Sequence, residues 1–292
     1  MNKIHIPVLL REMLSLLSPK NGGIYVDATF GSGGYSKAIL DSADCKIYAI
    51  DRDETVIEFY NKLSTEYQGK VELFIDKFSN MKNYLDIKDV DGIVFDLGVS
   101  SMQIDQGERG FSFMYNGPLD MRMDKFSHIN ASTFVNQLYE KEIANIIYDY
   151  SGERHSRRIA RAIVSARQKK HINTTFELAE IIRSVVFRGK SKIDPATRTF
   201  QAIRIWVNDE LGELEKGIKA AFELLNKGGR LIIISFHSLE DRIVKRFFQD
   251  SESIFPKKFS LLSKKVIKVS EQEVNENPRS RSAKLRAIER VL

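Results

Sequence analysis

The sequence predicts an α/β protein whose open parallel sheet is interrupted by an all-helical insertion. Short apolar and β-branched runs at residues 24–26, 46–51, 71–75 and 91–96 alternate with helical patterns, which is typical of a parallel sheet. From about Gly107 to Thr199 no clear strand occurs, and the apolar spacing is helical. A fifth apolar run at residues 228–235 resumes the sheet, so we interpret the middle segment as an inserted domain.

The composition limits the class of protein. A chain of 292 residues can form one large domain or two modest ones with ample cores. The single cysteine, Cys45, excludes an internal disulfide and a cysteine-cluster metal site, and the five histidines show no paired ligand spacing. No apolar run has the length of a membrane span, and the first residues lack a signal-peptide pattern. We therefore expect a reduced, cytoplasmic protein that uses neither a metal nor a membrane.

The net charge of +6 is unevenly distributed. Between Arg154 and Arg204 there are 13 lysines and arginines but only three acids, and the tail from Lys257 onward is also basic. Concentrated positive charge suits a phosphate-rich partner, whereas evenly spread charge would serve solubility alone.

A short amphipathic helix at residues 8–17 precedes the first strand, and we expect it to pack on the sheet. The strand at 24–26 leads into a glycine-rich turn at 31–34, and residues 35–40 then open a helix. Glycines allow close approach to the backbone, and a helix start offers free N–H groups. This sequence of elements predicts a pocket for a nucleotide-like ligand.

Two acids decide between the cofactors that use such a pocket. Asp51 ends the second strand about 20 residues downstream, where an acid that binds ribose is expected. Both NAD and S-adenosylmethionine would use that acid. The dinucleotide fingerprint needs a third glycine where this chain has Ser36, and Asp27 before the glycines would repel a pyrophosphate but suit a cationic or amine-bearing ligand. These residues favour S-adenosylmethionine.

The third and fourth strands end at the same predicted edge. Phe78 follows the third strand and either flanks an adenine ring or is a buried loop aromatic. Asp96 ends the fourth strand, and Gly98 with two serines follows it. Because Asp27, Asp51 and Asp96 all end parallel strands, we expect them to converge on one active-site edge.

The insertion begins with a loop at 107–124 that is rich in aromatic, methionine and charged residues. Helices are predicted at 131–150, 153–168 and 174–186. On the second, the apolar residues fall on one face and four arginines on another, with no intervening acids. We interpret these arginines as a nucleic-acid contact. They are Arg154, Arg157, Arg158 and Arg161.

A long helix at 199–225, which carries the only tryptophan, Trp206, leads to the fifth strand. His237 follows at the active edge, either as a catalytic residue or as a hydrogen-bonded loop histidine. Ser238 with Asp241 resembles a capping box before a helix at 243–248. The last two strands are predicted at 265–269 and 285–292, with a basic loop at 277–281.

Together, nine blocks of this sequence resemble one family, the bacterial 16S ribosomal RNA cytosine-N4 methyltransferases. They run in family order along nearly the whole chain. The blocks are HIPVLL (5–10), DATFGSGG (27–34), AIDRD (49–53), FDLGVSS (95–101), ERGFSFM (108–114), GPLDMRMD (117–124), PATRTFQ (195–201), ISFHSLEDR (234–242) and ENPRSRS (276–282).

The resemblance implies a class I S-adenosylmethionine-dependent methyltransferase fold, a Rossmann-like sheet with an inserted helical domain. The catalytic domain would be 1–106 with 200–292, and 107–199 would recognise the substrate, a decoding-centre cytosine in the RNA of the small ribosomal subunit. Cofactor contacts would fall at Gly33, Gly34, Tyr35, Asp51, Phe78, Asp96 and Gln103. The family usually has histidine where this chain has Tyr35, which favours a backbone contact there. The segment between 248 and 276 is shorter than in the family.

Asp96 is the first candidate for catalysis, with Asp120 and His237 as further candidates. The Asp/Asn-Pro-Pro-Tyr motif of many amino-methyltransferases is replaced here by residues 97–99, so the residues that stabilise the base stay open. Two alternatives also stay open: an NAD-dependent oxidoreductase, and a non-catalytic RNA-binding assembly factor. The sequence leaves open whether the chain forms a homodimer.

Overall fold

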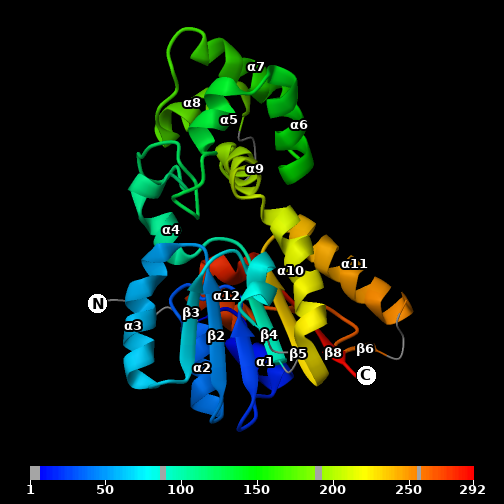
Figure 1. Ribbon diagram of the computed structural model, residues 1–292. Coiled ribbons are helices and arrows are strands. Elements are labelled where there is room, and N and C mark those ends of the chain that lie inside the picture. Colours follow the sequence, from blue (N-terminus) through cyan, green and yellow to red (C-terminus); the bar gives the residue numbers. More distant parts are fainter. Residues whose placement is uncertain (1–6, 86–89, 188–192, 255–257) are drawn as a thin grey trace. The chain divides into compact units, whose positions relative to one another are not determined.

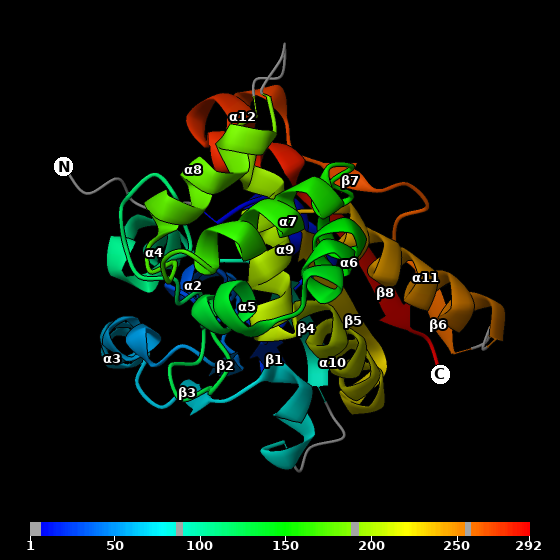
Figure 2. The same cartoon turned by 90° about the horizontal axis from the view of Figure 1, so that it is seen from above.

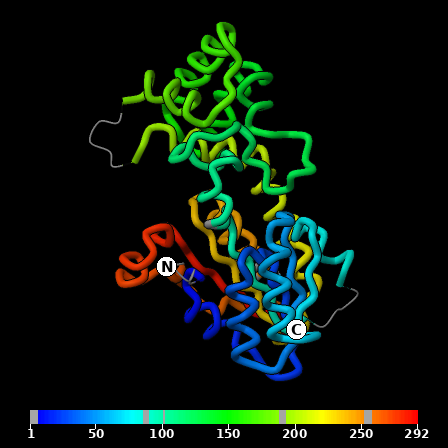
Figure 3. The backbone as a smooth tube through the Cα atoms, turned by 90° about the vertical axis from the view of Figure 1, so that its left-hand side faces the viewer, coloured from blue at the N-terminus to red at the C-terminus, as the bar shows by residue number. Residues whose placement is uncertain are grey.

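The computed structural model describes residues 7–85, 90–187, 193–254 and 258–292. His5 and Ile6, which open the first matching block, lie outside these ranges. The chain forms two compact units: the sheet unit (Met1–Gly98 with Leu211–Leu292) and the helical unit (Val99–Glu210). The backbone leaves the sheet unit after Gly98 and returns to it at Leu211 (Figure 3).

The sheet unit contains one mixed sheet, and helices connect its strands along the chain (Figure 1). Its strands are β1 (Ile24–Asp27), β2 (Lys46–Asp51), β3 (Val71–Ile75), β4 (Val90–Asp96), β5 (Leu225–Ser235), β6 (Phe259–Leu261), β7 (Ile267–Lys268) and β8 (Lys284–Arg290). Its α-helices are α1 (Leu10–Leu17), α2 (Gly34–Ser42), α3 (Ile57–Glu66), α10 (Glu210–Leu224), α11 (Ser238–Ile254) and α12 (Glu271–Glu276). Short 3₁₀ turns are η1 (Glu54–Val56), η2 (Phe78–Asn83) and η4 (Pro278–Ser282).

The strand order is β3-β2-β1-β4-β5-β8-β6, with β7 also paired to β8. The first five strands are parallel, and β8 is antiparallel to β5. The order reverses between β1 and β4, and ligands of open α/β sheets bind at such a reversal, beyond the carboxyl ends of the strands. Asp27, Asp51 and Asp96 are the last residues of β1, β2 and β4, so the predicted convergence at one edge is confirmed.

The two faces of this sheet are covered by different helices. Apolar residues of α10 and α11, among them Leu214 and Val244, share a core with Ile93 and Phe95 of β4. On the other face, α1 lies against β4 so closely that a Cβ at Gly92 would meet the Leu17 side chain at 2.4 Å. The packing expected of the first helix is therefore present.

The helical unit has its own core. Its helices are α4 (Ser101–Asp105), α5 (Ala131–Gln137), α6 (Glu140–Ser151), α7 (Ser156–Arg167), α8 (Thr175–Val185) and α9 (Ala196–Asn208), with a 3₁₀ turn η3 (Gly107–Arg109). Viewed as in Figure 2, α5 to α8 surround α9, whose buried Phe200 and Ile203 belong to a core shared with all four. Among its described residues, β pairing is limited to one bridge between Pro118 and Thr174. The predicted all-helical character is confirmed for these residues.

Several predicted element bounds are wrong, each for a local reason. The helix expected over 131–150 is two helices, because Leu138 and Tyr139 are extended and Tyr139 opens a capping arrangement with Glu142. The helix expected over 199–225 is broken at Asp209, which adopts a left-handed conformation (φ 47°) after α9. The strand expected at 265–269 is only the two residues of β7, and β6, at Phe259–Leu261, was not predicted.

The unit boundaries also differ from the predicted insertion at 107–199. The helical unit begins before it, with α4, and ends after it, with all of α9. The apolar side chains of α9 explain its membership, because Ile203 and Val207 are buried in the helical core. The helix after β5 is longer than predicted, since α11 begins at Ser238.

Candidate active site

Asp51 holds the glycine-rich turn that follows β1. Its Oδ2 accepts a hydrogen bond from the Gly31 N–H at 2.8 Å, and its Oδ1 accepts one from the Asp53 N–H at 2.9 Å. Burial raises the pKa of this half-buried carboxyl group. Each carboxylate oxygen keeps acceptor capacity, so Asp51 can bind further donors, such as ribose hydroxyls, while it holds the turn.

Asp27 does not face a ligand as expected, and that interpretation is wrong. Its side chain is fully buried. Oδ2 accepts a hydrogen bond from the Ser36 hydroxyl at 2.7 Å, and Oδ1 accepts a longer one from the Thr29 N–H at 3.3 Å. Asp27 therefore ties β1 to the first turn of α2, and Ser36, absent from the dinucleotide fingerprint, has a structural role.

Burial raises the pKa of Asp27 to about 6. The folded chain then binds this proton more tightly than the unfolded chain, so the stability contribution is full below the unfolded pKa and is lost as the pH rises through about 6. The free energy of unfolding of Asp27→Asn, taken relative to that of the wild type, should therefore rise by roughly 3 kcal/mol between about pH 4 and pH 7. Urea unfolding of both proteins at several pH values measures this difference. A difference that does not change with pH would contradict it.

Asp96 carries an unsatisfied acceptor. Its N–H donates to Thr29 Oγ1 at 2.7 Å, but its Oδ1 is buried without a hydrogen-bond partner among the described residues. Burial, with the charges of Asp27 and Glu240, raises the pKa of Asp96 well above its ordinary value. An unpaired buried oxygen costs free energy. This atom is therefore suited to a hydrogen-bond donor or a cation of a ligand.

The glycines of the turn are required by the chain itself. Gly33 has φ +78°, and a Cβ there would lie 2.9 Å from the Phe30 ring. A Cβ at Gly34 would lie 2.4 Å from the Pro7 side chain. The next residue, Tyr35, is buried, and its hydroxyl donates to the Val8 carbonyl at 2.6 Å. The Tyr35 side chain thus fastens the segment before α1 over the turn.

Phe78 begins η2 after β3, at the predicted edge. It is half-buried and packs edge-on against Phe95 of β4, with ring centroids 5.1 Å apart. It also lies against Gly217 of α10, where a Cβ would be 2.5 Å from its ring. Phe78 therefore fills part of the core, and the exposed part of its side chain is available to a planar ligand.

His237 lies directly after β5, beside Glu240. Its Nε2 is 3.1 Å from Glu240 Oε1, while Glu240 Oε2 accepts hydrogen bonds from the N–H groups of Phe236 and His237. Glu240 therefore caps α11, and the predicted capping box of Ser238 with Asp241 is wrong. Asp241 instead pairs with Lys284 and Arg286 of β8, at 2.9 and 2.8 Å.

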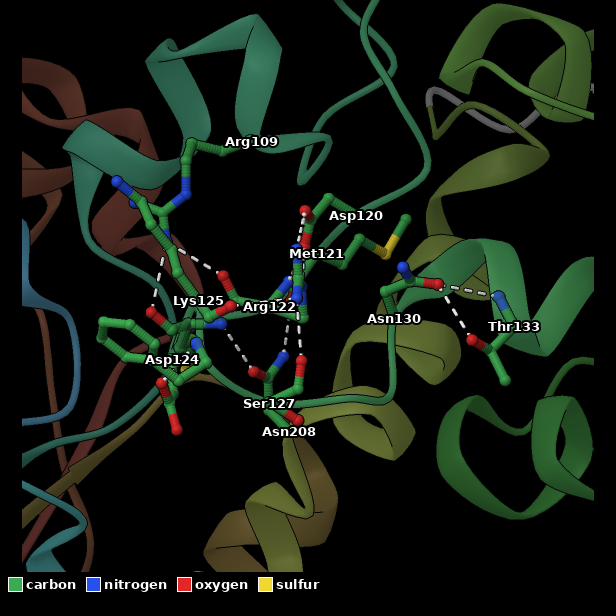
Figure 4. A network of polar contacts seen from close by, with 12 residues as sticks. Arg109, Asp120, Met121, Arg122, Asp124, Lys125, Ser127, Asn130, Thr133 and Asn208 are labelled. Atoms are coloured by element: carbon green, nitrogen blue, oxygen red, sulfur yellow. Dashed lines mark hydrogen bonds and ion pairs between the residues drawn. The ribbon is translucent and has the colours of Figure 1, made fainter.

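Asp120 lies in the helical unit, in a network of polar contacts (Figure 4). Arg122 donates from Nε and Nη2 to the two Asp120 oxygens, each at 2.7 Å. Burial alone would raise the pKa of Asp120, but these bonds and the Arg122 charge outweigh it and lower the pKa. Asp120 is therefore a weaker proton acceptor than Asp96.

The loop around Asp120 is held from two further sides. Met121 is fully buried in a left-handed conformation (φ 60°), which is strained for a residue with a side chain. Asn208 donates to the Met121 carbonyl and accepts from the Met123 N–H, both at 2.8 Å. Arg109 donates to the Arg122 carbonyl at 2.9 Å. Sequence reasoning missed Asn208 and Arg109, because neither lies close to Asp120 in the chain.

The remaining candidates also belong to the helical unit. Gln103 is buried and forms a capping box with Ser100 at the start of α4. The four arginines are exposed, but Arg154 precedes α7 instead of lying on it. Arg161 lies 3.8 Å from Glu140 of α6, so the expectation that no acid pairs with this face is wrong for Arg161. That pair is largely exposed and contributes little stability.

Comparison with known proteins identifies the family. The sequence profile of the MraW methylase family matches residues 2–291. The chain belongs to the MraW methylase family. It is 73% identical over 290 residues to ribosomal RNA small subunit methyltransferase H of Wolbachia sp. subsp. Drosophila simulans (strain wRi), covering 98% of this chain and 99% of that protein. It is 61% identical to the protein of the same name from Ehrlichia ruminantium (strain Gardel), covering 97% of this chain and 98% of that protein.

Membership of the MraW methylase family confirms the predicted methyltransferase fold and S-adenosylmethionine as the cofactor. The NAD-dependent oxidoreductase is thereby excluded. The crystal structure of PH0851, 12% identical, has a TM-score of 0.50 over 99% of this chain and 47% of that chain, which concerns the fold alone. Within the described residues, no helix combines the length and apolar character needed to cross a membrane.

Proposed function

We propose that this chain methylates the N4 amine of a decoding-centre cytosine in the RNA of the small ribosomal subunit, in the cytoplasm. One observation carries the assignment of chemistry to the sheet edge: Asp96, at the reversal of the strand order, has a buried oxygen without a partner among the described residues. The sequence blocks support the substrate, and so do the two relatives, both named ribosomal RNA small subunit methyltransferase H.

The residues at this edge fit S-adenosylmethionine. The half-buried Asp51 has acceptor capacity for the ribose hydroxyls, and the exposed part of Phe78 offers an apolar surface to the adenine. Gly33, Gly34 and Tyr35 contribute backbone to the turn. The cofactor supplies an electrophilic methyl group on a sulfonium cation, and the unpaired Asp96 oxygen suits the positive charge of such a ligand. The contact proposed for Gln103 rests on the family resemblance alone.

Cytosine N4 is a poor nucleophile, because its lone pair is delocalised into the ring. A side chain that accepts a hydrogen bond from N4–H keeps the nitrogen lone pair directed at the methyl group, and it can take the proton after the methyl transfer. We assign this role to Asp96, whose pKa is raised, so that it is more basic than an exposed carboxylate. Asp120 and His237 are assigned to positioning, since Arg122 binds the Asp120 carboxylate and His237 Nδ1 accepts the Glu240 N–H at 3.4 Å.

Transfer of a labelled methyl group to small ribosomal subunits tests the proposal. The expected product is N4-methylcytosine at one position, identified by nuclease digestion and mass spectrometry. The same assay with deproteinised RNA shows whether the assembled subunit is required. Binding to subunits without methyl transfer would instead establish a non-catalytic assembly factor.

We assign RNA binding to the exposed arginines of the helical unit, and a salt series tests it. Replacing Arg157, Arg158 and Arg161 with alanine should weaken RNA binding without changing cofactor affinity. Each lost phosphate contact should make the plot of log affinity against log salt shallower by roughly 0.7–0.9. Subunit affinity measured across a range of salt concentrations gives both slopes.

A matched control separates a local contact from a general charge effect. Arg11, Lys62 and Lys245 are exposed cations of the sheet unit, and their triple alanine variant changes the net charge equally. We expect its salt slope to equal that of the wild type. Parallel lines for the arginine variant and the wild type would mean that α7 does not contact phosphates. A lowered melting temperature would assign the arginines to stability.

A further inference from the structure

We propose that an exposed basic surface beside the carboxyl edge of the sheet binds phosphates of the RNA strand that carries the target cytosine. This C-terminal basic surface consists of Lys268, Arg279 and Arg281, all in the sheet unit. The inference rests on the proposed RNA substrate, and it places an RNA contact on the same unit as Asp96. It also gives a role to the block ENPRSRS (276–282), which neither the cofactor nor the methyl transfer uses.

The end of the chain is the source of a marked positive charge. From Lys257 to Leu292 there are ten lysines and arginines but only four acids. This excess of six equals the net charge of the whole chain, so the charges of all preceding residues cancel. Positive charge gathered in one segment attracts a phosphate-rich partner.

Strand pairing places this surface at the edge that holds Asp96. Asp96 of β4 lies opposite Ile234 of β5, and Ile234 lies opposite Leu285 of β8. Because β8 is antiparallel to β5, the residues before Lys284 lie beyond the carboxyl end of β5. Two strand spacings separate Asp96 from Leu285, which is about 10 Å. This distance is that of about three nucleotides in a stacked strand, so phosphates close to the target base can reach the surface.

The turn η4 keeps its two arginines on the outside. Figure 3 shows the segment that contains α12 and η4 (orange to red) as a lobe at one side of the sheet unit. Ser280 is fully buried, and its N–H and its hydroxyl both donate to the Asn277 carbonyl, at 2.9 and 2.7 Å. The Ala283 N–H donates to the Ser280 carbonyl at 2.7 Å. Arg279 and Arg281, on either side of Ser280, are exposed. Buried short side chains therefore hold the turn, and its cationic side chains remain at the surface.

The neighbouring cations of β8 provide a contrast. Lys284 and Arg286 are both paired with Asp241, at 2.9 and 2.8 Å. Lys268 lies opposite Lys284 in the sheet, is exposed, and forms no ion pair within the described residues. Arg281 likewise has no ion pair with any residue that the structure describes. The cations that stabilise the fold here are paired, whereas Lys268 and Arg281 keep their charge for a partner.

The acids of α12 do not pair with Lys268 or Arg281 in the described part of the chain. Glu273 Oε1 accepts the Leu9 N–H at 2.8 Å, and Glu276 Oε1 accepts a hydrogen bond from Gln272 at 3.0 Å. Phosphate oxygens accept bidentate hydrogen bonds from an arginine and attract the point charge of a lysine. The surface therefore suits the RNA backbone.

Replacing both Lys268 and Arg281 with alanine tests the surface. The probe is deproteinised RNA of the small ribosomal subunit, bound to the full chain over a range of salt concentrations. We expect the RNA affinity to fall by about tenfold at low salt, and the plot of log affinity against log salt to become shallower by roughly 1.4–1.8, because two phosphate contacts are lost. The affinity for S-adenosylmethionine and the melting temperature should equal those of the wild type.

Two further variants separate a local contact from a general charge effect. Lys62→Ala with Lys227→Ala removes the same charge from exposed positions on α3 and near the start of β5, at the opposite edge of the sheet. Its salt slope should equal that of the wild type. Lys268→Arg with Arg281→Lys exchanges the two cations without changing the charge, and it should keep most of the wild-type slope.

An alanine variant with the salt slope and RNA affinity of the wild type would overturn the inference. If methyl transfer to subunits is nevertheless observed, the proposed function stands and only the surface assignment fails. A shallower slope, combined with no methyl transfer by the wild type, would support the surface and overturn the proposed function. If the variant binds deproteinised RNA normally but intact subunits weakly, the surface contacts a ribosomal protein and the phosphate assignment is wrong.

Discussion

Asp96→Asn should reduce methyl transfer by a factor on the order of 10²–10⁴, with a much smaller loss of cofactor affinity. The asparagine side chain keeps the shape but cannot take a proton from the cytosine amine. The fold should tolerate the change, because the ionised carboxyl group is disfavoured by burial and by Asp27 and Glu240. Single-turnover methyl transfer and calorimetric titration of S-adenosylmethionine measure the two effects separately.

The sign of the stability change provides a control. A folded pKa above the unfolded value means that ionised Asp96 destabilises the fold as the pH rises. Cofactor-free Asp96→Asn should therefore melt no lower than the wild type at neutral pH. If transfer and cofactor affinity fall in step, Asp96 binds the cofactor and is not the proton acceptor.

Asp51→Ala should weaken the binding of S-adenosylmethionine by roughly 1.5–3 kcal/mol, or about ten- to 150-fold. Part of the loss comes from the ribose hydroxyls and part from the turn, since Asp51 also accepts the N–H groups of Gly31 and Asp53. The fold should survive, because the residue lies at a strand end. Titration calorimetry gives the affinity, and a thermal melt shows whether the variant is folded.

Asp91→Ala is the matched variant at the opposite edge of the sheet. Its carboxylate also accepts a backbone N–H, that of Ile24 at 2.9 Å, and it pairs with Lys20. We expect this variant to lose stability but to keep its cofactor affinity. An Asp51→Ala protein that is folded and binds the cofactor like the wild type would rule out Asp51 as the ribose contact.

Much of the sheet could be predicted because its signals are local. Each parallel strand is a short apolar run, and the acids that end β1, β2 and β4 follow from the same runs. Parallel pairing then brings these strand ends to one edge without further information. The apolar period likewise predicted α8 to within a residue at each end.

The details that failed depend on contacts between distant residues. The orientation of Asp27 is set by its burial and by its hydrogen bond with Ser36. Glu240 caps α11, because Asp241 pairs with Lys284 and Arg286 instead. The break at Asp209 is a single left-handed residue between two amphipathic helices, and their apolar spacing continues across it. The hydrogen bond from Asn208 to the Met121 carbonyl joins residues that are 87 positions apart in the sequence.

The division of the sheet unit into two chain segments has a consequence for the growing polypeptide. The helical unit is one continuous segment, Val99–Glu210, and is complete before β5 or β8 has been synthesised. All residues of this unit have been synthesised once Glu210 emerges, so it can fold before the sheet is complete, whereas β4 has no β5 partner until Leu225–Ser235 emerges. Over that interval the nascent chain carries a complete helical unit and an unpaired strand edge, and unpaired strand edges are prone to aggregation.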